Sequence, residues 1–375
     1  MRFIAPTRFL AFFCALALTM TAASASPTNV IFLIGDGMGF EQVKAAGIFA
    51  NGAPGTLSFE QAPYSGEVTT YSANSSVTDS AAAATAIATG VKVNNYVISQ
   101  TAGGQPIQTV LEYFQDAGKS TGLVTTTYMT HATPAAFAAH EVDRNSYTAI
   151  GADYLQTRPD VLLGGGANGM SVSSAQAAGY SVVTNADGLA GVNAATTTML
   201  SGQFGNTYLP YEYDGLGLLP HLSQMAAKAL DVLDNDADGF FLMIEGGLID
   251  QAGHARHLGR NVGETVEFAN TVQTVLDWAA GRTDTLIIVT ADHETGGLHV
   301  TGDPSTWQDG VLPAVTWSTT GHTGVNVPVY AWGPNAELVS GTINNTDFFH
   351  IATVPEPATM LLLTAGGLAV LRRRG

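Results

Sequence analysis

The sequence alternates apolar runs with segments of helical character. The runs end in glycine or a carboxylate, and each is followed by a helix-like stretch. This alternation is typical of an α/β fold with a mostly parallel central sheet and helices on both faces. We expect strands over residues 29–34, 121–125, 160–163, 240–244, 285–290 and 327–332, and helices over 40–49, 79–89, 107–117, 222–233 and 262–280. The Gly-, Ala- and Thr-rich stretch 165–214 is expected to be a loosely packed part of the same domain.

The N-terminus has the features of a signal peptide. Arg2 and Arg8 precede an apolar run over residues 9–18, and Ala23-Ser24-Ala25 fits a signal peptidase site. We therefore assign residues 1–25 to a signal peptide in preference to a buried N-terminal helix. The only cysteine, Cys14, lies inside it, so the rest of the chain can form neither a disulfide nor a cysteine-ligated metal site.

The C-terminus resembles a PEP-CTERM sorting signal. Val354-Pro355-Glu356-Pro357 precedes an apolar run, 358–371, and then three arginines, 372–374. As a helix this run would span ~21 Å, short of the ~30 Å hydrocarbon core. We expect residues 354–375 to be a transient anchor that a membrane processing enzyme cleaves, with a permanent anchor as the alternative. Arginines that stay cytoplasmic would place residues 26–353 outside, in the periplasm, at the cell surface or in the medium, after passage through the export machinery.

The exported part is strongly acidic. The two terminal segments contain five of the 14 Lys and Arg residues and one of the 31 Asp and Glu residues, so the net charge of the remainder is about −21. Such a field disfavours nucleic acid as a specific partner. A phosphate group would have to be held by local cations or metals.

Four potential metal ligands stand at the ends of three expected strands. Asp36 ends FLIGDGMG, Glu245 ends FFLMIEGG, and Asp292 and His293 end LIIVTADHETGG. The carboxyl ends of parallel strands meet at one edge of a sheet, where ligands collect. Metal clustering explains this set better than solvated turns do.

Further ligand types follow the same strands. Asp250 and His254 are four residues apart, which places both on one face of a helical turn, and His322 adds an imidazole in STTGHTG. A lone histidine is more often structural than a ligand, and we place the remaining ones in that class: His140, His221, His257, His299 and His350.

A serine stands at the start of an Ala-rich helix. In SSVTDSAAAATAIATG, Asp79 caps or begins the helix, Ser80 follows, and Gly90 ends it. The helix N-terminus favours an alkoxide or a bound phosphate at Ser80. An ordinary capped helix explains this segment as well, and its residues leave both interpretations open.

An EF-hand pattern is also present. Asp234, Asp236, Asp238 and Glu245 match the calcium-loop spacing. We do not favour calcium binding, because FFLMI is typical of a buried strand and GGLIDQAGH cannot supply the exit helix.

Seven motifs in order resemble the alkaline phosphatase family: IGDGMG, VTDSAAAATAIATG, THATPAAF, AAHEVDRNSY, EGGLIDQAGH, TADHETGG and STTGHTG. The resemblance covers residues 29–349. It implies two zinc sites and a third site that usually holds magnesium. The implied ligands are Asp250, His254 and His322 for one zinc, Asp36, Asp292, His293 and the Ser80 oxygen for the other, and Asp36, Thr133 and Glu245 for the third metal, with His131 near it also counted as metal-binding.

The resemblance also implies a chemistry. Ser80 would be the nucleophile and form a phosphoserine, Arg144 would clamp the phosphate, and Asp79 would hold the Arg144 guanidinium. The substrates would be small phosphate monoesters. The expected protein is a secreted alkaline phosphatase.

Two positions depart from the best-known bacterial pattern. His131 replaces an aspartate and Gln251 replaces a lysine, which leaves the identity of the third metal open and predicts weaker binding of the phosphate product. The stretch from His293 to His322 leaves little room for a dimerisation subdomain, so a homodimer is compatible with the sequence without being required by it.

Two other functions could use similar residues. A phosphodiesterase or sulfatase of the same superfamily would share the sheet and zinc carboxylates, but DSAAAAT lacks the sulfatase motif, and Arg144 with a third metal suits a terminal phosphate. A surface protein that only binds phosphate or metal would not be expected to keep the whole ligand set. Turnover of an aryl phosphate distinguishes these functions.

Overall fold

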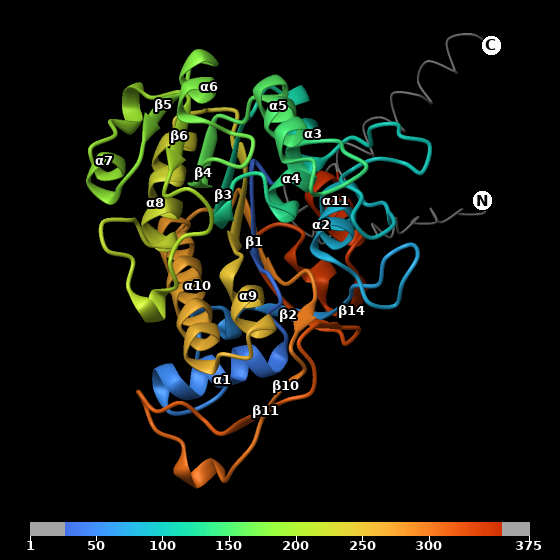
Figure 1. The fold of residues 1–375 in the computed structure, drawn as a ribbon, viewed down its shortest axis with the longest axis vertical. Helices are drawn as coiled ribbons and strands as arrows, with labels where there is room; N and C mark the ends of the chain where they lie inside the picture. The colour runs from blue at the N-terminus through green and yellow to red at the C-terminus, as the bar shows by residue number, and fades with distance from the viewer. Residues whose placement is uncertain (1–26, 355–375) are drawn as a thin grey trace, which may run out of the picture. The chain divides into compact units, whose positions relative to one another are not determined.

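A ten-stranded sheet runs through the centre of the protein (Figure 1). The computed structural model describes residues 27–354. Within the sheet, β13 is antiparallel to β2 and β8, and the other neighbouring pairs are parallel. The strand order is β14 (Gly341–Asn344), β2 (Tyr64–Thr69), β13 (Val327–Trp332), β8 (Thr285–Thr290), β1 (Asn29–Gly35), β7 (Phe240–Gly246), β3 (Ser120–Tyr128), β4 (Val161–Gly165), β6 (Leu200–Gln203) and β5 (Ser181–Val183).

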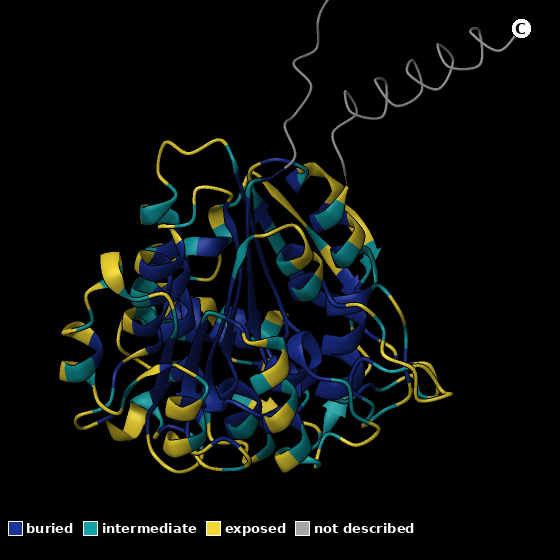
Figure 2. Cartoon of the chain, turned by 90° about the horizontal axis from the view of Figure 1, so that it is seen from above, coloured by how far each residue is buried: buried dark blue, intermediate teal, exposed yellow. Residues whose placement is uncertain are grey.

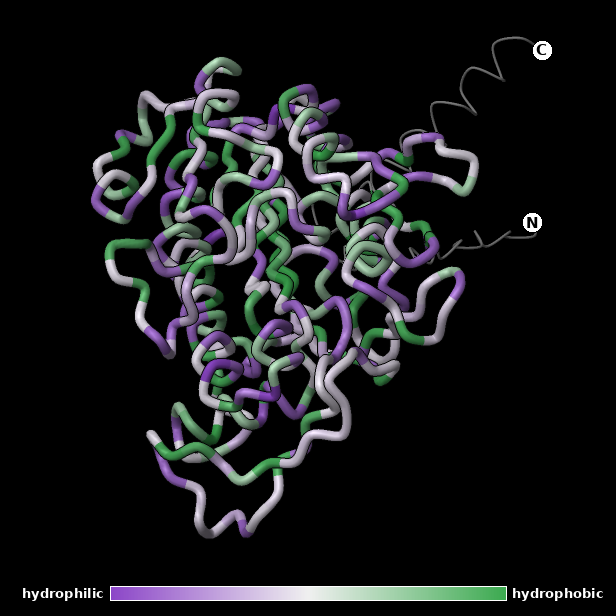
Figure 3. Tube along the Cα trace, in the orientation of Figure 1, coloured by the Kyte–Doolittle hydropathy of each residue, from purple (hydrophilic) through white to green (hydrophobic). Residues whose placement is uncertain are grey.

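The central strands are apolar because both of their faces are covered. Every residue of β1, β7 and β8 is buried, as parallel strands between two helical layers must be. Figure 2 shows these strands in the buried interior, with exposed residues on the outer loops. In Figure 3 the hydrophobic residues gather along the same strands.

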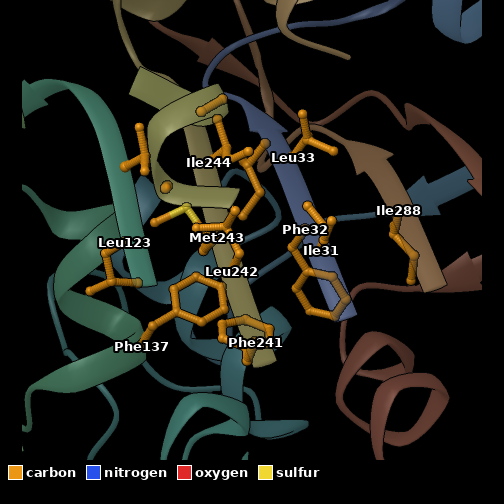
Figure 4. Packing of buried hydrophobic residues seen from close by; sticks show 14 of the residues in the cluster. Ile31, Phe32, Leu33, Leu123, Phe137, Phe241, Leu242, Met243, Ile244 and Ile288 are labelled. Carbon is orange, nitrogen blue, oxygen red and sulfur yellow. The ribbon is translucent and has the colours of Figure 1, made fainter. Parts of the chain in front are cut away.

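An aromatic cluster packs against one face of these strands (Figure 4). The ring of Phe241 lies 5.4 Å from that of Phe32 on β1 and 5.7 Å from that of Phe137, which belongs to a covering helix. Such pairs contribute about 0.5–1.5 kcal/mol beyond the area they bury. The register of β1 against β7, in which Ile34 pairs with Glu245, places the residues at the strand ends.

Two groups of helices cover the sheet (Figure 1). One group contains α1 (Phe40–Asn51), α8 (Leu222–Leu233), α9 (Leu248–His254) and α10 (Leu258–Trp278). The other contains α2 (Ser80–Thr89), α3 (Val110–Asp116), α4 (Ala132–Ala138), α5 (Tyr147–Thr157) and α11 (Asp347–Thr353).

The predicted fold class and all six predicted strands are confirmed, and each predicted helix has a counterpart. The helix predicted over 107–117 begins only at Val110, and α10 begins earlier than predicted, at Leu258. The stretch 165–214 belongs to the same sheet, because it contributes β6 and β5. The signal peptide and sorting tail lie outside the described residues, and the domain boundaries remain predictions.

Smaller elements complete the described range. They are α6 (Val172–Ala177), α7 (Ala186–Ala190), the short strands β9 (Glu294–Thr295) and β12 (His322–Thr323), which pair with each other, and the paired strands β10 (Leu298–Val300) and β11 (Val315–Trp317). Five short 3-10 helices are also present in the described range, at Ser58–Gln61, Ala194–Thr196, Glu212–Asp214, Pro304–Thr306 and Ala336–Val339. Among residues 27–354, no helix has both the length and the apolar character that crossing a membrane requires.

The EF-hand pattern does not form a calcium loop. Asp236 accepts hydrogen bonds from the backbone N–H and the hydroxyl of Ser120, at 2.8 and 2.7 Å, and Asp234 pairs with Arg282. Both aspartates precede β7, whereas Glu245 stands near its carboxyl end. The buried strand between them keeps these side chains apart.

Candidate metal centre and catalytic site

The structure brings the strand-end residues together at one edge of the sheet. Ile34 of β1 pairs with Glu245 of β7 and with Thr290 of β8, so Asp36, Glu245 and Asp292 all lie at the carboxyl ends of adjacent strands. All three side chains are fully buried. Around them the described residues form three groups of metal-ligand atoms, each group spanning less than 4.8 Å.

The first group is Asp250, His254 and His322. The Nδ1 atoms of His254 and His322 donate to the backbone carbonyls of Thr320 and Thr78, at 2.6 and 2.9 Å. When both rings are neutral, their Nε2 atoms carry lone pairs. These two Nε2 atoms lie 3.2 Å apart, and Asp250 Oδ1 lies 3.3 Å from that of His254 and 3.5 Å from that of His322. Three electron-rich atoms therefore face one another. A cation between them would satisfy all three atoms.

The second group joins Asp36, Asp292 and His293 beside Ser80. His293 Nε2 lies 3.1 Å from Asp292 Oδ2, 3.6 Å from Asp36 Oδ1 and 3.3 Å from Ser80 Oγ. Ser80 is the first residue of α2, and Asp79 caps this helix by accepting from the Ala82 N–H at 3.0 Å. The serine hydroxyl therefore stands at a helix N-terminus and against this ligand group.

The third group shares Asp36 with the second and adds Glu245 and His131. His131 Nδ1 lies 3.9 Å from Glu245 Oε1, and its Nε2 lies 3.3 Å from a guanidinium nitrogen of Arg144. Thr133, on α4, is fully buried. His131 thus stands between this group and Arg144.

Several polar atoms at this edge are buried without a hydrogen-bond partner. They are both oxygens of Asp36, Glu245 Oε1, His131 Nδ1 and Thr133 Oγ1, and Asp292 Oδ2 likewise accepts no hydrogen bond, although His293 Nε2 lies 3.1 Å from it. Such atoms destabilise a fold unless something satisfies them. Their convergence in the second and third groups is what a metal centre requires, so the residues present fit the implied cations.

In the second and third groups the pKa shifts of the ligands point the same way, whereas in the first group hydrogen bonding to Asp250 raises the pKa of His254 to about 9. Burial, followed by repulsion from Asp292, raises the pKa of Asp36 well above its ordinary value. Burial also raises the pKa of Glu245 to about 7 and that of Asp292 to about 6, and it lowers the pKa of His293 well below its ordinary value. Carboxylates that repel one another and neutral imidazoles together suit divalent cations.

Arg144 and Asp79 form an ion pair beside the site, and both side chains are partly exposed. Arg144 Nη1 donates to Asp79 Oδ2 at 3.1 Å. Burial disfavours the charged guanidinium, but Asp79 raises the pKa of Arg144 and keeps it cationic. The planar Arg144 group can thus grip an oxyanion beside Ser80.

Several supporting residues were not predicted. Thr125 and Thr127 donate to Glu245 Oε2, and Thr295 Oγ1 donates to Asp250 Oδ1 at 2.5 Å. Threonine is common in strands, so only its position beside the strand ends could have indicated this role. The five histidines assigned to structural positions lie outside the three groups at this edge. His221 does lie within ligand distance of Glu212 and Glu267, away from the strand ends.

Comparison with known proteins agrees with this arrangement. The family model described as "Alkaline phosphatase" matches residues 27–312 and 303–355, and a model of the PEP-CTERM protein-sorting motif matches residues 353–374. Alkaline phosphatase 3 of Bacillus subtilis is 32% identical, over 85% of this chain and 87% of that protein. The streptomycin-6-phosphate phosphatase of Streptomyces griseus is 34% identical, over 89% of this chain and 92% of that protein.

Solved structures agree as well. The cold-active alkaline phosphatase of Shewanella sp. superposes with a TM-score of 0.78 at 32% identity, covering 86% of this chain and 98% of that one. A histidine-to-aspartate variant of the alkaline phosphatase from the Antarctic bacterium TAB5, with magnesium at its M3 site, gives a TM-score of 0.77 at 30% identity, covering 88% and 97%. This chain therefore belongs to the alkaline phosphatase family of phosphomonoester hydrolases.

Proposed function

We propose that this protein is an exported alkaline phosphatase that hydrolyses small phosphate monoesters through a phosphoserine on Ser80. The observation that carries the proposal is the convergence of partnerless buried oxygens on the edge where Ser80 stands against His293. These groups need cations, and a serine beside cations at a helix N-terminus is placed to act as a nucleophile.

The proposed cofactors are two zinc ions and one magnesium ion. One zinc would be held by the first group, the second by the second group together with Ser80 Oγ, and magnesium by Asp36, Thr133 and Glu245 next to His131. When bound, such ions lower the pKa of an adjacent hydroxyl and offset charge on the attacking and leaving oxygens. The TAB5 structure with magnesium at its M3 site is a histidine-to-aspartate variant, so it supports magnesium at a carboxylate-rich third site, while His131 leaves the identity of the third metal open here.

The chain's own residues account for the rest of the reaction. Ser80 Oγ attacks phosphorus, the bond to the leaving alcohol breaks, and water then cleaves the phosphoserine to release phosphate and restore the serine. The Ser80 alkoxide is favoured by the amides at the start of α2. Arg144, held by Asp79, grips the two non-bridging oxygens and orients the phosphorus toward Ser80.

The same geometry favours monoesters over diesters. Arg144 is cationic, and its guanidinium contacts His131, a member of the third group. Both features match the extra charge of a terminal phosphate, which a diester lacks. The alternative functions, a phosphodiesterase or a phosphate-binding surface protein, have no comparable support from the site.

The match to the PEP-CTERM motif supports export to the cell envelope. We propose that residues 26–353 form the exported enzyme, that residues 1–25 are a signal peptide, and that residues 354–375 are processed by the sorting system. A permanent anchor remains the alternative for that tail.

The experiment that tests the function compares three substrates. Purified protein is given an aryl phosphate monoester, the matching diester and the matching sulfate at alkaline pH, before and after chelation and after zinc and magnesium are restored. We expect only the monoester to be cleaved efficiently, with activity lost on chelation and recovered with metal. Preference for the diester would contradict the substrate class, and metal binding without turnover would favour the binding protein.

The role of Ser80 is tested separately. Ser80→Ala should lower turnover by at least about 10³-fold, because the nucleophile is gone, while metal content after dialysis stays near that of the wild type. Ser201, a buried serine on β6, provides a control through Ser201→Ala, which should keep turnover. Wild-type turnover in the Ser80 variant would refute the phosphoserine mechanism.

A further inference from the structure

Tyr96 lies beside Asp79 and Arg144 in a strained conformation. Its φ is +74°, in the left-handed region that disfavours a bulky residue. It occupies the third position of a turn closed by the Val97 N–H donating to the Asn94 carbonyl at 3.2 Å. A positive φ at that position normally selects glycine or asparagine.

The backbone of Tyr96 is hydrogen-bonded to both Arg144 and Asp79, the two residues proposed to clamp the phosphate. Its N–H donates at 3.1 Å to Asp79 Oδ2, the same oxygen that accepts from Arg144, and its carbonyl accepts from the Arg144 N–H at 2.8 Å. Two further backbone bonds, between Ile98 and Glu141, continue this ladder. The surroundings therefore impose the conformation, and strain persists only where they do so.

Packing does not account for a tyrosine at this position. The residue is 57% exposed. Glycine would make the same two backbone hydrogen bonds without strain. An exposed tyrosine that is costly to hold beside Asp79 and Arg144 is explained by a contact with a ligand.

The position of Tyr96 identifies the ligand chemistry. Arg144 holds the non-bridging phosphate oxygens, and Ser80 attacks opposite the leaving group, so the remaining part of the substrate points out of the site toward its rim. We infer that Tyr96 is a specificity-determining residue that stacks against planar or aromatic leaving groups of phosphate monoesters. This inference rests on the proposed function.

The test compares two monoesters, phenyl phosphate and glycerol phosphate, in the metal-loaded enzyme. Tyr96→Gly and Tyr96→Asn remove the ring and suit the positive φ, and Tyr96→Phe keeps the ring. We expect the first two variants to raise KM for phenyl phosphate by about two- to tenfold with kcat nearly unchanged. Kinetics with glycerol phosphate should stay as in the wild type, and Tyr96→Phe should keep the aryl preference.

A second readout separates recognition from a structural role. Tyr96→Gly should raise the melting temperature by about 1–3 °C, because strain is relieved, while it weakens aryl binding. Ala167→Gly, at another positive φ of 60°, is the matched control and should leave substrate preference unchanged.

Three outcomes would overturn the inference. They are an equal loss for both monoesters, unchanged KM for phenyl phosphate, and a lower melting temperature in Tyr96→Gly, which would make the ring a packing element. If the wild type cleaved neither monoester, the proposed function itself would fail, and this result is distinct from the other three.

Discussion

Asp36, at the carboxyl edge of the sheet, is unfavourable for folding without a metal ion. Asp36 is fully buried, accepts no hydrogen bond and has a raised pKa because burial and Asp292 disfavour its charge. An isolated protein chain would avoid such a residue, since a buried unpaired charge is costly. A bound dication removes the cost, so the metal-free protein should be markedly less stable than the loaded one.

The residue at position 251 should set how tightly the product binds. Gln251 donates to Asp250 Oδ2 at 3.0 Å and carries no charge that could hold phosphate. Gln251→Lys places an ammonium there, so we expect the inhibition constant for inorganic phosphate to fall by about threefold or more. Competitive inhibition with an aryl phosphate measures this change, and an unchanged constant would show that the missing cation does not limit product binding.

The chemically distinctive residues of the site could be predicted from the sequence. Asp36, Glu245, Asp292 and His293 could be predicted to meet because parallel strands end at one edge. The supporting Thr125 and Thr295 were missed because threonine is an ordinary strand residue. The φ of Tyr96 was equally inaccessible, because contacts distant in sequence impose it.

At the scale of elements, the turn after β1 has to fit tightly against α9. Gly37 has a φ of +74°, and a Cβ atom there would lie 2.8 Å from both Asp250 Cα and Thr295 Oγ1. The first metal group and the end of β1 are therefore in direct contact through a residue without a side chain.

Because of this contact, we expect that adding one methyl group at Gly37 lowers the stability of the protein substantially. Gly37→Ala should lower the free energy of unfolding by about 2–4 kcal/mol, through backbone strain and overlap with Asp250, and should weaken metal retention. Gly55→Ala is a matched control, because Gly55 also has a φ of +74°, but a Cβ atom there would meet no other atom within 4 Å. Denaturant unfolding and metal content measure both effects. Equal losses in the two variants would show that the turn conformation alone matters.

Helix α10 contains a carboxyl group that makes stability depend on pH. Burial raises the pKa of Glu264 to about 8 from an ordinary value of 4.5. The folded protein therefore holds this proton more tightly than the unfolded chain. Its stabilising contribution is complete below about pH 4.5 and is lost as the pH rises through about 8.

Glu264→Gln should remove this dependence. The amide oxygen can still accept the Glu212 N–H, which now donates to Glu264 Oε1 at 2.8 Å. At pH 9 we expect the variant to be more stable than the wild type by about 1–3 kcal/mol, with a smaller difference at pH 6. Thermal unfolding across this range measures it, with the exposed Glu337→Gln as control. Parallel curves for wild type and Glu264→Gln would contradict the assignment.

Elements differed in how well the sequence predicted them. The central strands stood out because burial on both faces makes them continuously apolar, as in β1. The edge strands β5 and β14 did not, since they are short and partly exposed, and they lack such a run. The edges of a sheet depend on neighbouring segments more than on their own composition.

On the scale of the whole molecule, the acidic charge opposes the substrate. The full chain carries a net charge of −17, while the site must attract a phosphate dianion. We expect kcat/KM for phenyl phosphate to rise by about two- to threefold as ionic strength increases from about 10 to 150 mM, because salt screens the repulsion. Phosphocholine, whose cation offsets the phosphate charge, should show a smaller rise. A steady fall with salt for both substrates would show that local attraction at Arg144 dominates.

The pairing of β1 has a consequence for when the enzyme can become active. The first strand of the sheet lies between β7 and β8, so Val30 pairs with Phe241 and with Leu286, both more than two hundred positions later. Loops of that length close late and slowly. In a chain exported from its N-terminus, β1 therefore emerges long before its partners and waits unpaired. Asp36 and His322 can meet only after residue 322 has also crossed, so a chain still in transit lacks the complete set of metal ligands.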